Sequence, residues 1–85
     1  MPAVSRRAYT IQVGASLEVF TTQKAQLSRA REILATWMRE TGEKRVGALR
    51  SGFVSVGEHT IQLQTFTHPS TVARLLKADQ RRELP

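Results

Sequence analysis

The longest regular pattern in the chain is TQKAQLSRAREILATWMRETG, residues 22–42. Its apolar side chains recur at spacings of three and four, the period of a helix with one buried face. The stripe consists of Leu27, Ala30, Ile33, Leu34, Trp37 and Met38. Thr21 or Thr22 can cap the first turn, and Gly42 can end the last. The pattern therefore predicts a helix over Gln23–Thr41, against which the rest of the fold must pack.

The residues before this helix alternate between apolar and polar, as the residues of a half-buried strand do. Arg7–Val13 shows the alternation first, and Leu17–Phe20 resumes it after Gly14-Ala15-Ser16. Two strands joined by so short a turn form an antiparallel hairpin. We expect Glu18, on the second strand, to face water.

A second hairpin is expected after the helix, from Val46–Val56 and Thr60–Phe66 with the turn residues 57–59 between them. Parity divides these strands into a face with Val54, Val56, Ile61 and Leu63 and a face with Phe53, Ser55, Gln62, Gln64 and Phe66. His68-Pro69 then opens a last helix, whose apolar stripe is Val72, Leu75 and Leu76. The order ββαββα predicts an α+β fold, an antiparallel sheet packed against one long amphipathic helix with a shorter C-terminal helix.

The length and composition indicate one small domain. A chain of 85 residues supports a single core, so we expect one domain over 1–85 with flexible ends at 1–6 and 79–85. With no cysteine there is no disulfide to add stability, and a homodimer is expected to supply some. The start of the chain lacks the apolar run of a signal peptide, and no segment reaches the roughly 20 apolar residues of a membrane helix. We expect a cytoplasmic protein, in the host cytosol if it is phage-encoded.

The side chains needed for catalysis or metal binding are sparse. His59 and His68 are the only histidines, and Asp79 is the only aspartate. A zinc site needs three or four ligands, and a nucleophilic triad needs a well-placed acid to orient its histidine. The spacing of Gly47, Gly52 and Gly57 matches no phosphate-binding loop. We predict no enzyme, no metal and no cofactor.

One candidate binding surface is the face of the second hairpin that carries Phe53, Phe66, Gln62 and Gln64. Aromatic and amide side chains on an open sheet can stack on bases or form the centre of a protein interface. The alternative is that the last helix packs on this face, which would make both phenylalanines core residues. Trp37 is expected in the core because of its place in the helix stripe.

The second candidate surface is basic. Lysine and arginine exceed aspartate and glutamate by 13 to 7, a net charge of +6 that attracts polyanions. Arg74, Lys77 and Arg81 share one face of the last helix, and the set is completed by Arg82, Arg6 and Arg7. Such a row can contact phosphates without reading sequence. The alternative is a solvated face that keeps the protein soluble.

The format resembles that of small phage-encoded inhibitors, the anti-CRISPR proteins. The residues that carry the resemblance are Tyr9-Ile11-Val13, Leu17–Phe20, the helix segment 30–35 and Trp37. It is a resemblance of format, length and absent catalytic residues, so it assigns no functional residue. It implies an inhibitor that occludes a surface of a host defence complex, often as a dimer. Many such inhibitors are acidic mimics of DNA, whereas a chain of charge +6 must meet an acidic protein surface or nucleic acid.

Three functions are therefore open. The leading hypothesis is a non-enzymatic phage or mobile-element inhibitor that blocks a host nucleic-acid-handling complex, a protein or ribonucleoprotein partner. The alternative is a small nucleic-acid-binding protein that uses the Arg/Lys face. A small basic ribonuclease toxin is the third.

Overall fold

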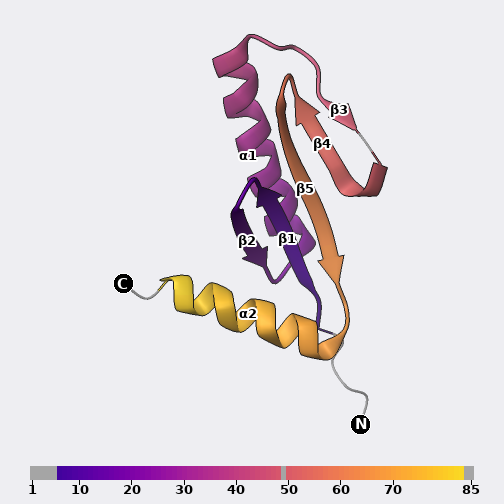
Figure 1. Cartoon of the computed structure of the whole chain (residues 1–85), viewed down its shortest axis with the longest axis vertical. Helices are drawn as coiled ribbons and strands as arrows, with labels where there is room; N and C mark the ends of the chain where they lie inside the picture. The colour runs from indigo at the N-terminus through magenta and orange to yellow at the C-terminus, as the bar shows by residue number, and fades with distance from the viewer. Residues whose placement is uncertain (1–5, 49, 84–85) are drawn as a thin grey trace.

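The computed structural model of this protein describes residues 6–48 and 50–83, with side chains up to Lys77. Within them, one antiparallel sheet has the strand order β2-β1-β5-β4-β3. Helix α1 lies along one face of the sheet, and helix α2 crosses the opposite face at one end (Figure 1). The expected α+β fold is confirmed.

The elements follow the predicted order with one local difference. They are β1 (Ala8–Val13), β2 (Ser16–Phe20), α1 (Gln23–Thr41), β3 (Gly47–Ala48), η1 (Arg50–Gly52), β4 (Phe53–Val56), β5 (His59–Phe66) and α2 (Pro69–Glu83). The strand predicted over 46–56 is divided, because the single turn of 3₁₀ helix η1 separates β3 from β4. Both hairpin turns hold two residues, and each opens on a glycine of positive φ, Gly14 or Gly57.

Both ends of α1 are fixed as the sequence predicts. The hydroxyl of Thr22 accepts a hydrogen bond from the backbone N–H of Ala25 at 3.1 Å. At the other end Gly42 has a left-handed φ of 77°, and its N–H donates to the carbonyl of Met38 at 2.9 Å. Only glycine adopts this conformation without strain, so it defines where the helix ends.

The buried face of α1 packs over the central strands. Ala30 lies against Ile11 and Ile61, and the surrounding cluster includes Val13, Phe20, Ile33, Leu34, Trp37, Val54 and Leu63. The prediction was wrong for Leu27, which is 37% exposed, whereas the polar Gln26 is only 3% exposed. In the first turns of α1, the buried face is therefore centred one residue earlier than the apolar pattern predicts.

Gln26 is buried because it has partners in the sheet. Its amide Nε2 donates to the carbonyl oxygens of Thr10 at 2.9 Å and of Gln64 at 3.1 Å. Thr10 and Gln64 are paired residues of the adjacent strands β1 and β5. A buried amide is stable only when it is hydrogen-bonded. Gln26 therefore links the first turns of α1 to both central strands.

Helix α2 covers only one end of the opposite face. Val72 is 2% exposed and packs with Ala8 and Val19, and Leu17, Phe66, Leu75 and Leu76 surround this second cluster. The predicted stripe of the last helix is confirmed by these contacts. In Figure 1 the strands run along the long axis of the molecule, while α2 lies across their lower end. No helix in the described part of the chain is long and apolar enough to cross a membrane.

Gly52 is required by a close backbone approach. Its φ is 79°, and a Cβ atom at this position would collide with the backbone carbonyl oxygen of Leu63. Gly42 also has a positive φ, of 77°, but its Cβ position is empty space. An alanine at position 42 would therefore meet only the strain of the left-handed backbone, whereas an alanine at position 52 would meet that strain and a collision.

Replacing Gln26 by leucine should destabilise the fold by about 1–3 kcal/mol, because two buried carbonyl oxygens lose a hydrogen-bond donor. Urea denaturation followed by circular dichroism measures the change. Gln23→Leu is the control, since Gln23 is exposed on the same helix. Equal stability of the two variants would contradict a structural role for Gln26.

Gly52→Ala should lower the free energy of unfolding by more than Gly42→Ala does. The left-handed backbone costs an alanine about 1–2 kcal/mol at either position, and the collision with Leu63 adds roughly 1–3 kcal/mol at position 52 only. Thermal unfolding of the two variants side by side checks the order. Equal melting temperatures would show that the turn at η1 can open to admit a side chain.

Candidate functional site

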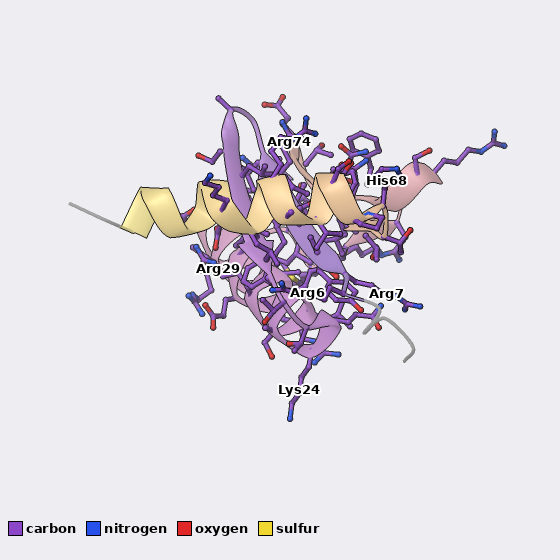
Figure 2. All side chains as sticks on the ribbon, turned by 90° about the horizontal axis from the view of Figure 1, so that it is seen from below. Arg6, Arg7, Lys24, Arg29, His68 and Arg74 are labelled. Atoms are coloured by element: carbon purple, nitrogen blue, oxygen red, sulfur yellow. The ribbon has the colours of Figure 1, made fainter. Side chains whose placement is uncertain are left out.

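Charge is distributed unequally along the molecule. The carboxylates whose side chains are described belong to β2, α1, the loop after α1 and the β4–β5 turn: Glu18, Glu32, Glu40, Glu43 and Glu58. Glu18 lies on β2 between Leu17 and Val19, which pack against α2, whereas the other four belong to elements outside the α2 cluster. The side chains of Asp79 and Glu83, on α2 itself, lie outside the described residues. The end where α2 crosses the sheet carries five exposed cations, which we call the basic end: Arg6, Arg7, Lys24, Arg74 and Lys77. Figure 2 views the molecule from this side and shows four of the five.

The cations of the basic end have no carboxylate partner in the described part of the chain. There the ion pairs are those of Arg29, whose guanidinium lies 3.0 Å from Glu18 and 3.2 Å from Glu32. An unpaired arginine or lysine keeps its charge available to an external anion, whereas an ion pair is already neutralised. The charges of the basic end are therefore not neutralised by any carboxylate whose side chain the structure describes.

The fold brings the start of β1 against α2 at this place. Arg6 and Arg7 precede β1, and β1 lies against α2 through Ala8 and Val72. In Figure 2 Arg6 and Arg7 appear on one side of α2 and Arg74 on the other. Arg6 and Arg7, which complete the basic set proposed from the sequence, thus lie on the other side of α2 from Arg74. Arg81 and Arg82 belong to the last turns of α2, and their side chains lie outside the described residues.

A pocket of about 410 Å³ opens in the basic end. Its lining comes from four parts of the chain and consists of Arg6, Arg7, Tyr9, Thr21 and Leu76. Thr21 directly precedes the N-cap of α1, where the helix dipole is positive, and the first turn of α1 contains no acidic residue. The pocket therefore combines two guanidinium groups and two hydroxyl groups with an apolar wall.

Sequence reasoning missed three of these lining residues. It placed Tyr9 on a strand face, Thr21 at a possible helix cap and Leu76 in an apolar stripe. Each assignment is correct locally, but only the packing of α2 beneath β1 gathers the three around Arg6 and Arg7. The sequence did show one hydroxyl residue, Tyr9, close to Arg6-Arg7 and another, Thr21, at the start of the long helix.

The candidate sheet face is divided by α2. Phe66 packs against the α2 cluster and is part of the core. Phe53 and Gln62 are half-buried and paired, and Gln62 also pairs with the exposed Gln12 on β1. We call Phe53, Gln62 and Gln12 the sheet row; it crosses β4, β5 and β1 beyond the end that α2 covers (Figure 1). Gln64 lies two pairs closer to α2 along the same strands, opposite Thr10.

A second hollow, of about 350 Å³, lies between α1 and the edge strand β2. It is lined by Val13, Ser16, Glu18, Arg29, Ile33, Thr36 and Trp37. Glu18 does not face open water as predicted, because it accepts a hydrogen bond from Arg29 at 3.0 Å. This bond raises the pKa of Arg29, because the charged guanidinium donates to a carboxylate. The ion pair occupies the polar side of the hollow.

The two histidines have partners unrelated to metal binding. The ring of His59 stacks on Trp37 with a centroid distance of 4.9 Å and an interplanar angle of 23°. Nδ1 of His68 lies 2.9 Å from the hydroxyl of Ser70. In the described residues no three His, Cys, Asp or Glu side chains gather as a metal site. The basic end is accordingly the best-defined candidate site.

Comparison of the chain with protein-family models, with curated proteins and with solved structures found no match. The functional assignment therefore depends on the geometry and charge of the molecule.

Proposed function

We propose that this protein binds nucleic acid through its basic end, without catalysis. The observation that carries the proposal is the unequal distribution of charge: five exposed cations without carboxylate partners among the described residues share one end, and four of the five described carboxylates belong to elements outside the α2 cluster. A polyanion with evenly spaced charges is the ligand that gains most from such an arrangement, because each contact releases counterions.

The contacts expected from α2 are to phosphates rather than to bases. Arg74 and Lys77 are exposed on α2 and are three residues apart, which is about 4.5 Å along a helix axis. Two cations at that spacing can contact neighbouring phosphates of one strand. Long, exposed side chains of this kind fix position and give affinity, but they carry little sequence information. We therefore expect binding that is tight at low salt and weakly selective for sequence.

The double variant Arg74→Gln/Lys77→Gln should weaken binding to labelled single- and double-stranded DNA and RNA. The plot of log K against log salt concentration should become shallower by about one for each lost phosphate contact. Fluorescence anisotropy over a salt titration measures both quantities. The matched control is Lys44→Gln/Arg45→Gln, which removes the same charge from the exposed loop after α1. If both double variants lose the same affinity and slope, net charge rather than the basic end governs binding.

A second function is favoured by the sheet row. Phe53, Gln62 and Gln12 lie on a part of the sheet that α2 leaves uncovered, where Phe53 is paired with the amide side chain of Gln62. A half-buried aromatic residue next to hydrogen-bonding groups suits the centre of a protein interface. This favours an inhibitor of a host nucleic-acid-handling defence complex, of the anti-CRISPR type. The sheet row would contact the protein of the complex, and the basic end would contact its nucleic acid.

Expression of this protein in bacteria that carry an RNA-guided defence complex should restore the transformation of a targeted plasmid. Phe53→Ala should reduce the effect by about tenfold or more, the usual loss at an interface hot spot. Gln12→Glu tests the same row at an exposed position that the core does not need, and Thr65→Ala, exposed on the other face of β5, is the control. Unchanged plasmid loss at saturating expression of the unaltered chain would exclude this function for that complex.

A further inference from the structure

We infer that the pocket formed by Arg6, Arg7, Tyr9, Thr21 and Leu76 holds one phosphate group together with the nucleoside attached to it. The inference rests on the proposed function and assigns a particular role to one part of the basic end. We assign α2 to the phosphate backbone of a nucleic-acid strand and the pocket to the terminal nucleotide of that strand.

The polar side of the pocket suits a phosphate monoester. A guanidinium presents several N–H donors in a planar fork that matches the oxygens of phosphate, and two such groups balance the charge of about −2 that a terminal phosphate carries. Neither Arg6 nor Arg7 has a carboxylate partner among the described residues. The hydroxyl groups of Tyr9 and Thr21 add two neutral donors. None of the described lining residues is acidic.

The apolar side of the pocket suits the rest of a nucleotide. Leu76 and the ring of Tyr9 offer carbon surface beside the charged groups. Aromatic side chains of this kind stack on unpaired bases with little regard to their identity. The volume of about 410 Å³ lies near the lower end of small-ligand sites. It accommodates one nucleotide and excludes a segment of duplex.

The position of the pocket favours the end of a strand over its middle. Leu76 belongs to α2, so the pocket borders the helix that carries Arg74 and Lys77, although Arg74 lies on the other side of that helix from Arg6 and Arg7 (Figure 2). A nucleic-acid strand whose terminal nucleotide occupies the pocket can continue onto Arg74 by passing around α2. The start of α1 adds to the preference for negative charge, because its first turn has no acidic residue and includes Lys24.

Isothermal titration calorimetry on the full chain separates a strand end from a free nucleotide. The ligands are an eight-nucleotide single strand with a phosphate at its 5′ end, at its 3′ end or at neither, and adenosine monophosphate with adenosine as its control. We expect a terminal phosphate to raise affinity by about tenfold or more, the effect of one hydrogen bond to a charged group. We also expect adenosine monophosphate to bind and adenosine not to bind.

Variants identify the pocket as the source of this preference. Arg7→Gln should abolish the difference between phosphorylated and unphosphorylated strands, and Tyr9→Phe, which removes only a hydroxyl, should reduce it. Circular dichroism confirms that both variants fold. Lys44→Gln/Arg45→Gln should leave the difference unchanged, because that loop is remote from the pocket.

The outcomes distinguish this inference from the proposed function. Strands that bind equally with and without a terminal phosphate, in the unaltered chain, would overturn the pocket and leave the basic end as a backbone site. Binding of adenosine monophosphate without binding of any strand would confirm a nucleotide pocket and overturn the proposed nucleic-acid function. Absence of all binding would overturn both.

Discussion

A single buried amide joins the long helix to the middle of the sheet. Nε2 of Gln26 donates to carbonyl oxygens on β1 and β5, which are neighbours in the sheet but lie at opposite ends of the sequence. Apolar packing alone lets a helix slide over a sheet, since dispersion contacts are not directional. The two hydrogen bonds fix where α1 begins, and Thr21 and Thr22 follow from that position. The placement of the pocket beside the helix start therefore depends on a contact inside the core.

The two helices cover the two faces of the sheet to different extents. Helix α1 spans several strands on its face, whereas α2 crosses one end of the other face. The longest extent of the molecule is 50 Å. The basic end carries five of the ten cations that are exposed among the described residues, and the others lie on α1, on the loop after it and at η1. In the proposed function, the cations of the basic end would steer an approaching polyanion toward that end of the molecule.

The sequence was sufficient for patterns that depend on near neighbours. The caps Thr22 and Gly42, the two faces of the second hairpin and the stripe through Val72 all follow from local periodicity and turn chemistry, and all are confirmed. The predictions for Leu27 and Glu18 were wrong for one reason, because each environment depends on an element distant in sequence. Leu27 is exposed while its neighbour Gln26 bonds to the sheet, and Glu18 accepts a hydrogen bond from Arg29 on α1. Helical periodicity does not predict that a glutamine will be buried through hydrogen bonds to the carbonyl oxygens of two strands. The pocket was likewise beyond reach, because its lining exists only once β1 and α2 touch.

The docking of α2 has a thermodynamic consequence. Among the described residues, Val72, Leu75 and Leu76 hold α2 against the sheet. Because Leu76 is also a wall of the pocket, opening of α2 removes that wall. Binding in the pocket and docking of α2 on the sheet are thus linked equilibria. A ligand bound in the pocket would stabilise the docked position of α2.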